Sequence, residues 1–539
     1  MYKLQNYLSE KKWLLIYTLT SIALLYLIFS PAVNFLYYAG DDFRYTFGNP
    51  DLSCRRDDGF YFMMTLGRPL QAYMDCISFR YAYVVENMRY VRLIAVLLMG
   101  ISVGLIADWL RSFKISSIQA FLIAIALILI PHFYSDTILT GALSLPVPIL
   151  LVVIAYRCIQ KTYLLRDSIA KWTAVKKYGL YFLAFVLLIL ALLSYPAMVF
   201  FYATLMLTKI LFAGLDNWEK TRREIIIEGF IFFCACAVFF AWSSHNMHYH
   251  AHAPIPPQYM LMHPNFNPIE MFKRLTLLGN IFNPAVWALW PMSPVVNLSK
   301  WMSLILAVGL MVGLITALSK LRHRILTIVQ VLIFALCALL ISNAFPLLIP
   351  KLDLGSRLLM GTISSGIIIT IWALYRSCRI LPSVLGSALV TIVLMYYLIV
   401  QSYQTNLYLM RSSMAFVGYL NHSVQTISDY TTNHPSLKRI HYVINKDEVP
   451  FTRYFLTSGA LSILKGHNQY QTEWCASSHD GSKSEVENQN VTLNCLKSLP
   501  PNVIGITYSY LGDTFPKTDS MLVIKYRFDD FDVNKVISQ

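Results

Sequence analysis

The chain has 539 residues, of which 56% are hydrophobic, 14% are aromatic and only 14% are charged. Soluble globular proteins carry about 25% charged residues, so this composition excludes a typical cytosolic enzyme and a disordered chain. A net charge of +15 suggests nucleic-acid binding in a soluble protein. In this chain the charges must first be placed relative to a membrane, because long apolar segments fill most of residues 1–401.

Apolar segments of a length that can cross a bilayer, about 17 to 25 residues, recur along the chain. They predict a polytopic α-helical membrane protein with about 11 transmembrane helices, at residues 13–31, 93–110, 118–134, 143–160, 178–194, 197–213, 225–242, 301–319, 325–343, 358–375 and 384–401. The first segment is too long for a signal-peptide core. Pro31 and large polar residues follow it in place of a small-residue cleavage site, so we expect it to be retained.

The distribution of basic residues predicts the orientation. With the N-terminus inside, the short inside connections hold 20 of the 44 Lys and Arg residues, against 12 in the longer outside loops and 12 in the tail. Inside connections of membrane proteins are enriched in Lys and Arg, so the N-terminus is predicted in the cytoplasm and the C-terminus outside. Most of the net charge then comes from basic residues that set the orientation of the chain in the membrane, and nucleic acid is not an expected partner.

The polar parts divide the chain into a transmembrane module, residues 1–401, and a tail, residues 402–539. Two long outside loops are expected, at about 32–92 and 243–300. In the tail, β-branched and aromatic residues predict strands at 439–444, 503–508 and 521–526, a helix at 452–464 and an exposed loop at 476–490. This alternation predicts a small α/β domain.

Four of the nine cysteines lie in the predicted outside segments, as two local pairs. Cys54 pairs with Cys76 and Cys475 with Cys495 if the compartment is oxidising, and the alternative is four free thiols. Cys475 and Cys495 do not predict a zinc site, because no second CxxC or spaced His pair accompanies them.

The strongest candidate for chemistry is the pair Asp41-Asp42, which follows the first predicted span within the sequence Tyr37-Tyr38-Ala39-Gly40-Asp41-Asp42-Phe43-Arg44. Two adjacent carboxylates at the edge of a low-dielectric region favour a raised pKa for one of them. Such a group can remove a proton from an attacking hydroxyl. The alternative is a helix cap or an interfacial pair without a catalytic role.

The same loop contains Arg68, within Gly67-Arg68-Pro69, and Asp75, among several aromatic residues. Aromatic faces and carboxylates suit a sugar, and the guanidinium fork of arginine suits a phosphate. A second candidate is the short outside connection that carries Lys351 and Arg357, which either captures a lipid-linked phosphate or anchors the chain at the headgroups. His132 and Asp136, between the third and fourth spans, are further candidates for donor or acceptor contact.

The segment 245–263 is rich in histidine, and His-x-His-x-His in a strand would present three imidazoles on one face. No carboxylate or cysteine lies within the run and prolines follow it, so we favour a loop near the site over a metal centre. The sequence contains no Walker A loop, GxSxG elbow or HExxH motif. Ionisable groups gather at one membrane face, which favours an interfacial enzyme over a pump.

The Asp pair after the first span, the long loop with Gly67-Arg68-Pro69 and the many spans together resemble the integral-membrane GT-C glycosyltransferases. More narrowly, the chain resembles the O-antigen glucosyltransferase (Gtr) family of Gram-negative bacteria and their phages. The motif match covers about residues 32–92, and the layout covers the whole chain.

The resemblance implies transfer of a sugar, usually glucose, from an undecaprenyl-phosphate carrier to O-antigen of lipopolysaccharide on the periplasmic side of the inner membrane. Asp41 or Asp42 would be the general base, and Arg44, Arg68, Lys351 and Arg357 would contact the donor. It implies an inverting reaction without a metal or another cofactor.

Two further classes stay open. A transporter or flippase of lipid-linked sugars would place polar groups at the membrane midplane on broken helices and would show internal repeats. The sequence shows neither, although Pro146-Val147-Pro148 interrupts the fourth span. The second class is a scaffold whose tail binds a partner. Within the enzyme class, a GT-C enzyme that uses lipid A or a protein as its acceptor also stays open.

Overall fold

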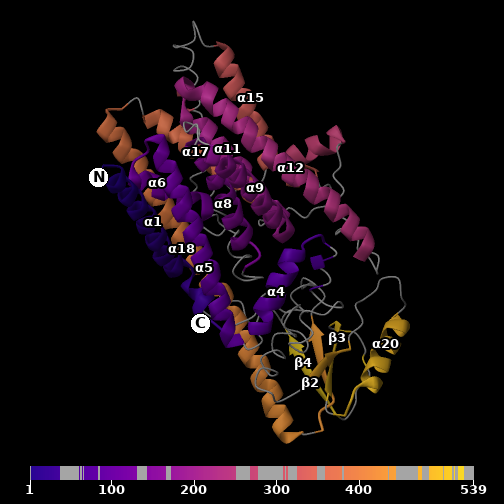
Figure 1. Ribbon diagram of the computed structural model, residues 1–539. Coiled ribbons are helices and arrows are strands. Elements are labelled where there is room, and N and C mark those ends of the chain that lie inside the picture. The colour runs from indigo at the N-terminus through magenta and orange to yellow at the C-terminus, as the bar shows by residue number, and fades with distance from the viewer. Residues whose placement is uncertain are drawn as a thin grey trace.

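Figure 1 shows the computed structural model of the chain, a long helical bundle with a small sheet at one end. The structure describes residues 2–36, 60, 63–64, 66–82, 85–129, 143–164, 171–250, 267–276, 308–309, 311–312, 325–348, 359–378, 381–434, 436–444, 471–475, 485–501, 503–510, 512, 515 and 520–526.

Most of the long helices of the bundle follow the predicted apolar segments, whereas α4 lies in the predicted first outside loop. The helices are α1 (Tyr2–Asn34), α4 (Pro69–Tyr81), α5 (Met88–Leu110), α6 (Ser117–Ile128), α8 (Pro146–Leu164), α9 (Lys171–Ser194), α10 (Pro196–Val199), α11 (Phe201–Ala213), α12 (Trp218–His250), α15 (Ile325–Ser342), α16 (Ala344–Leu348), α17 (Met360–Ser377) and α18 (Ser383–Asn433). Within the described residues, 7 segments are long and apolar enough to cross a membrane: 12–34, 85–113, 175–194, 196–213, 215–243, 325–342 and 383–411. The chain is therefore a helical membrane protein.

These 7 segments contain or closely match the predicted spans at 13–31, 93–110, 178–194, 197–213, 225–242, 325–343 and 384–401. The predictions at 143–160 and 358–375 fall on the helices α8 and α17. Most of the predicted span 301–319 lies outside the described residues. The total of 11 therefore stays a prediction.

One predicted boundary is wrong. The helix expected over 118–134 ends at Ile128, since Leu129 has φ −81° and ψ 71°; Pro131 also disfavours a helical residue directly before it. The helix α12 continues to His250, beyond the candidate span that ends at Ser243, so the outside segment predicted from residue 243 begins as a helix. The first part of the histidine run is thus helical, and the strand geometry that would align its imidazoles is absent from these residues.

The helices α1 and α5 pack closely, because two glycines of α5 face α1. A Cβ on Gly100 would lie 3.0 Å from the Cα of Ile22, and a Cβ on Gly104 would lie 3.0 Å from the Cα of Thr18. This Gly-x-x-x-Gly spacing is the one that lets two transmembrane helices approach closely. The hydroxyl of Ser21 uses the close approach to donate a 2.8 Å hydrogen bond to the carbonyl of Gly100.

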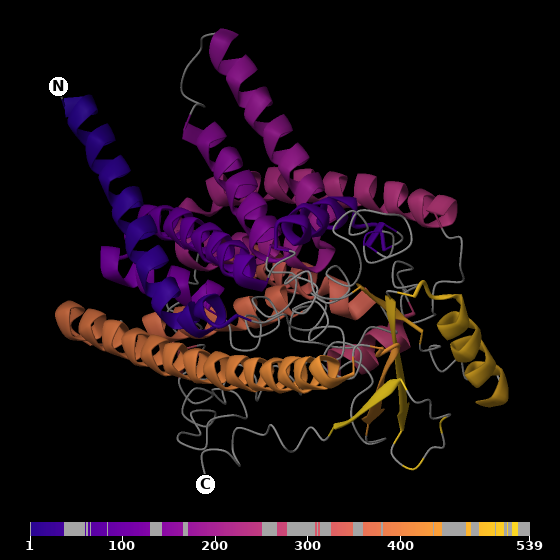
Figure 2. The same cartoon turned by 90° about the horizontal axis from the view of Figure 1, so that it is seen from below.

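The long helix α18 connects the membrane module to the C-terminal sheet (Figure 2). It has 51 residues, of which 383–411 form the candidate span, so its second part continues beyond the span. The hydroxyl of Tyr430, in the last turns of α18, donates to the carbonyl of Met521 at 3.3 Å. Ile427 joins the core of the sheet, so the helix end and the sheet pack as one unit.

The sheet consists of the parallel strands β1 (Arg439–Ile444), β2 (Gln471–Trp474), β3 (Val503–Tyr510) and β4 (Met521–Tyr526), in the order β2-β3-β1-β4. The three predicted strands are present, and β2 is an addition that the sequence pattern did not indicate. The helix expected at 452–464 lies outside the described residues.

The expected exposed loop 476–490 is wrong in its last part, because α20 (Glu485–Ser498) begins at Glu485. Cys495 on α20 forms a disulfide with Cys475, directly after β2, as predicted. Cys76 is also disulfide-bonded, whereas its predicted partner Cys54 lies outside the described residues. The disulfide fixes the helix against the end of a strand only four residues long.

The close approach of α1 and α5 generates a test. Changing both Gly100 and Gly104 to Ala is expected to destabilise the protein by about 1 to 3 kcal/mol, because each new methyl group must push α1 away. The measurement is the midpoint of thermal unfolding in detergent. Gly179→Ala on α9 is the matched control, since a Cβ there meets nothing within 4 Å, and it should leave the midpoint equal or higher. Equal midpoints for wild type and the double variant would contradict the proposed packing.

Candidate functional site

The structure describes only part of the predicted site. Arg68 and Asp75 are described, and so are three of the four predicted disulfide cysteines. The other predicted site residues lie outside the described residues: Asp41, Asp42, Arg44, His132, Asp136, Lys351 and Arg357. Their roles stay predictions, and the described residues beside them define the neighbourhood in which they are expected to act.

Arg68 is held in a tight turn directly before α4. Gly67 has a φ of +71°, a conformation that favours glycine, and its Cα faces Ser243 of α12 too closely for a side chain. Pro69 is the first residue of α4, where its missing N–H is not needed. The turn directs the guanidinium of Arg68 over the ring of Tyr195, with the Cζ atom 4.4 Å from the ring centre. A cation in this position has its orientation fixed before any ligand binds.

Asp75 lies further along α4, and its residue surface is only 2% exposed. Positions i and i+4 lie on the same face of a helix, so Asp75 shares the buried face of α4 with Gln71. The helix α4 packs against α9, which ends one residue before Tyr195. Arg68 and Asp75 thus lie at the start and in the middle of one helix, which the sequence analysis did not predict, and their roles in a site stay predictions.

Arg92 is a residue that the sequence analysis missed. It lies near the start of α5 and is fully buried, and its Nη1 atom donates to the carbonyls of Ala32, at 3.0 Å, and Phe35, at 3.5 Å. The last carbonyls of a helix lack partners within the helix and carry partial negative charge, so the arginine stabilises the end of α1. No local sequence signal pairs Arg92 with a carbonyl 60 residues earlier.

The described residues that flank the other predicted segments lie at this same end of the bundle. Phe345 of α16 contacts Phe200 ring to ring, with centroids 5.8 Å apart, just after α10. Gly361, near the start of α17, leaves no room for a side chain beside the carbonyls of Phe200 and Ser342. Since Tyr195 directly precedes α10, these contacts place α16 and the start of α17 next to a residue five positions after Tyr195.

Leu143 makes the corresponding link for the segment 130–142. It packs against the buried cluster that contains Met63 and Leu66, directly before the turn of Arg68. Arg274 adds a contact from the predicted second outside loop, because its Nη1 atom donates to the carbonyl of Pro346 at 2.9 Å. One end of the bundle thus gathers the described neighbours of every predicted site segment.

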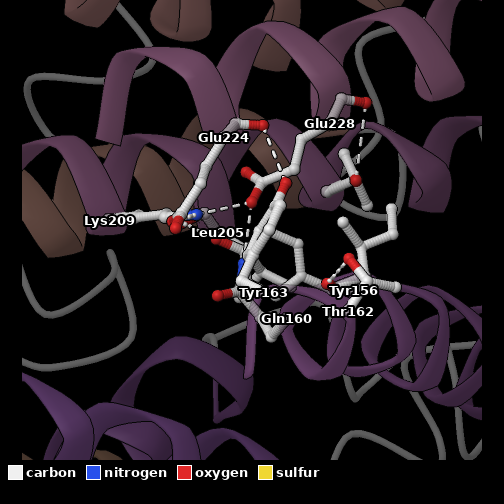
Figure 3. Close-up of polar contacts among 10 residues, drawn as sticks. Tyr156, Gln160, Thr162, Tyr163, Leu205, Lys209, Glu224 and Glu228 are labelled. Carbon is white, nitrogen blue, oxygen red and sulfur yellow. Dashed lines mark hydrogen bonds and ion pairs between the residues drawn. The ribbon is translucent and has the colours of Figure 1, made fainter. Parts of the chain in front are cut away.

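A second polar cluster lies inside the bundle and was not foreseen (Figure 3). Lys209 of α11 forms ion pairs with Glu224, at 2.7 Å, and Glu228, at 2.6 Å, both on α12. The amide of Gln160 on α8 donates to Glu228 at 2.7 Å. All three charged side chains are buried between helices.

This Lys209–Glu224–Glu228 triad connects three helices. The hydroxyl of Tyr163 on α8 donates to the backbone carbonyl of Glu224 at 2.9 Å, and its ring lies 4.7 Å from the Nζ atom of Lys209. Lys209 of the triad lies 14 residues after Tyr195 in the chain, which is about 20 Å along a helix. It is therefore separate from the region of Arg68 and Asp75.

A buried polar row crosses β1 and β3 in the C-terminal sheet. Arg439 donates from Nε to the Thr507 hydroxyl at 2.8 Å, and its Nη2 atom lies 3.2 Å from Nδ1 of His441. Because an arginine can only donate, Nδ1 of His441 is the acceptor and Nε2 carries the proton. The Nε2–H then donates to the Ser509 hydroxyl at 2.9 Å.

This geometry excludes a serine nucleophile activated by His441, because the nitrogen that faces Ser509 is already protonated. Burial, and then the positive charge of Arg439, lower the pKa of His441 to about 3. The imidazole thus stays neutral at physiological pH, with the ring of Phe515 stacked on it at 3.9 Å between centroids. The row is an internal hydrogen-bond network of the sheet.

Among the described residues, no group of three or more His, Cys, Asp and Glu side chains is arranged to hold a metal ion. Most of the histidine-rich segment lies outside these residues, so metal independence stays a prediction. Comparison of the sequence with protein-family models and with curated proteins finds no match.

The triad generates a prediction about stability. Lys209→Met leaves two carboxylates buried without their cation, and it is expected to cost about 3 to 5 kcal/mol. Arg223→Met is the matched control, because it removes an ion pair with Glu219 whose side chains are more than half exposed, worth at most about 1 kcal/mol. Thermal unfolding in detergent measures both, and equal effects of the two changes would contradict a buried triad.

The row in the sheet generates a pH prediction. An unfolded histidine has a pKa of about 6.5, so between about pH 6.5 and 3 the unfolded state binds the additional proton. The sheet is therefore expected to lose stability as the pH falls through this window, by up to about 1.4 kcal/mol per pH unit. The free energy of opening of the sheet can be measured at each pH by hydrogen exchange of the β1 and β3 amides, corrected for the intrinsic effect of pH on exchange.

His441→Gln should flatten this dependence, because the side chain no longer titrates. The exposed His434 is the control, and His434→Gln should leave the dependence as in wild type. The assignment is wrong if His441→Gln retains the full slope.

Proposed function

We propose that the chain is a GT-C-like membrane glycosyltransferase that moves a sugar, with glucose the first candidate, from an undecaprenyl-phosphate carrier to O-antigen of lipopolysaccharide. The observation that carries the proposal is Arg68, whose guanidinium is held over Tyr195 in the turn before α4, with the buried Asp75 about two helical turns further along the chain. A cation and a carboxylate beside a membrane suit a substrate with a lipid-linked phosphate and a sugar.

The proposed topology has the N-terminus in the cytoplasm, 11 spans and the C-terminal α/β domain in the periplasm, in the inner membrane of a bacterium. The bias of 20 basic residues in inside connections supports it. The disulfide between Cys475 and Cys495 supports an oxidising compartment for the tail. In this orientation Arg68 and Asp75 belong to the periplasmic face.

The proposed reaction is a direct displacement. Asp41 or Asp42 takes the proton of an acceptor hydroxyl, the hydroxyl oxygen forms a bond to the anomeric carbon, and the bond from that carbon to the phosphate oxygen breaks. The configuration inverts, and the polyprenyl phosphate leaves with the electron pair. Arg68, with Arg44, Lys351 and Arg357 as further candidates, stabilises the charge on the departing phosphate.

Arg92 supports the placement of the base in this proposal. It fixes the end of α1 at Ala32 and Phe35, and Asp41 follows Phe35 after six residues. A short connection to a fixed helix end limits where the carboxylates can lie, at up to about 3.5 Å per residue. The close packing of α1 on α5 contributes to the same constraint.

The test replaces Asp41 and Asp42 individually with Asn and measures sugar transfer from polyprenyl-phosphate sugars in membranes. Loss of a general base is expected to lower transfer about 100- to 10,000-fold in one of the two variants. Asp429→Asn on an exposed part of α18 is the control and should leave transfer unchanged. Full activity in both Asp41 and Asp42 variants would reject the general base.

A transporter or flippase of lipid-linked sugars is the second candidate, and the buried Lys209–Glu224–Glu228 triad favours it. Ionisable side chains within a membrane bundle commonly belong to ion or proton pathways. In a transferase, Glu228→Gln that folds normally keeps its transfer activity, whereas in an ion-coupled transporter it loses transport. Absence of transfer by the wild-type protein across several donors would favour this candidate.

A further inference from the structure

The helix α4 exposes large apolar and aromatic side chains. Its buried face contains the polar Gln71 and Asp75 together with the apolar Ala72 and Phe79, whereas Tyr73, Ile77 and Tyr81 point outward. These three outward side chains recur every four residues and are between 55% and 67% exposed. A helix at a water-exposed surface normally places its charged and amide side chains outward.

The exposed surface continues onto the neighbouring transmembrane helix. Tyr90 and Ile94 of α5 are also exposed, and the rings of Tyr81 and Tyr90 meet edge to face with centroids 6.4 Å apart. Ile94 belongs to the candidate span 85–113. The α4 patch, which we define as Tyr73, Ile77, Tyr81, Tyr90 and Ile94, therefore joins the surface of a helix that crosses the membrane.

Two exposed arginines border the α4 patch. Arg80 lies in the last turn of α4, and the guanidinium of Arg89 lies over the ring of Tyr90, 5.1 Å from its centre. Tyrosines collect at the boundary between the bilayer core and water, and arginines there reach the lipid phosphates. The patch thus combines an apolar surface, aromatic side chains with polar tips and complementary charge for a phosphate.

We propose that the α4 patch is a lipid-binding surface that lies within one leaflet of the bilayer, at headgroup depth, with Arg80 and Arg89 contacting lipid phosphates. The partner is the phospholipid surface, since the patch is continuous with a span and is bordered by cations. Asp75 lies on the opposite face of α4, so contact of the patch with the bilayer places Asp75 at headgroup depth. If the proposed function holds, this is also the depth of the phosphate of a lipid-linked donor.

The test places a photoreactive benzoylphenylalanine at position 77 of the full chain, in nanodiscs of phosphatidylethanolamine and phosphatidylglycerol. Illumination is expected to give lipid adducts at position 77, detected by mass spectrometry of the protein. The control has the same group at position 491, because Val491 is an exposed apolar residue of α20 in the C-terminal sheet region. It should give no lipid adduct.

Two outcomes would overturn the proposal. Absence of lipid adducts at position 77 would show that the patch is not in the bilayer, and a covalent dimer in place of adducts would assign it to a second copy of the chain. This experiment does not measure sugar transfer, so its failure is distinct from a failure of the Asp41 and Asp42 test.

A second measurement tests the arginines. Changing both Arg80 and Arg89 to Gln is expected to lower the share of anionic phosphatidylglycerol among the adducts several-fold. Lys273→Gln is the control, because Lys273 is also exposed but lies on the separate helical segment 268–276 and pairs with Glu270. An unchanged lipid ratio in the double arginine variant would reject the phosphate contacts.

Discussion

The close packing of α1 on α5 is the constraint on which the site region depends. Gly100 and Gly104 remove the side chains that would separate the two helices, and Ser21 adds a hydrogen bond across the interface. Arg92 of α5 donates hydrogen bonds to the carbonyls of Ala32 and Phe35 at the end of α1. The α1–α5 pair thus aligns the first helix along its length and fixes its end, from which the chain continues to Asp41 and Asp42.

Buried charges are used differently in separate parts of the molecule. The Lys209–Glu224–Glu228 triad ties α11 and α12 together, with α8 contacting it through neutral side chains, so its polar groups are mostly satisfied within the bundle. Arg68 instead stacks on Tyr195 beside the turn into α4. The first arrangement holds helices together, whereas the second holds a half-buried cation at the start of α4.

The C-terminal sheet is joined to the bundle by the continuous helix α18, whose last turns enter the sheet core through Ile427. In the sheet, the polar side chains from Arg439 to Ser509 are hydrogen-bonded to one another. His441 cannot act as a base toward Ser509, because the nitrogen that faces Ser509 already carries a proton. Within the described part of the sheet, this row is therefore structural and is not a candidate for acid–base chemistry.

The sequence by itself determined the membrane class, most helix positions, the three main strands and the Cys475–Cys495 disulfide, because these follow from local hydrophobic patterns and from the pairing of nearby cysteines. It also selected Arg68 and Asp75. Only the tertiary structure decided that Arg92 stabilises the end of α1, that Lys209 meets Glu224 and Glu228, and that α4 exposes large apolar side chains. Each of these depends on which helix lies beside which, and contacts between residues far apart in the chain leave no periodic signal in either segment.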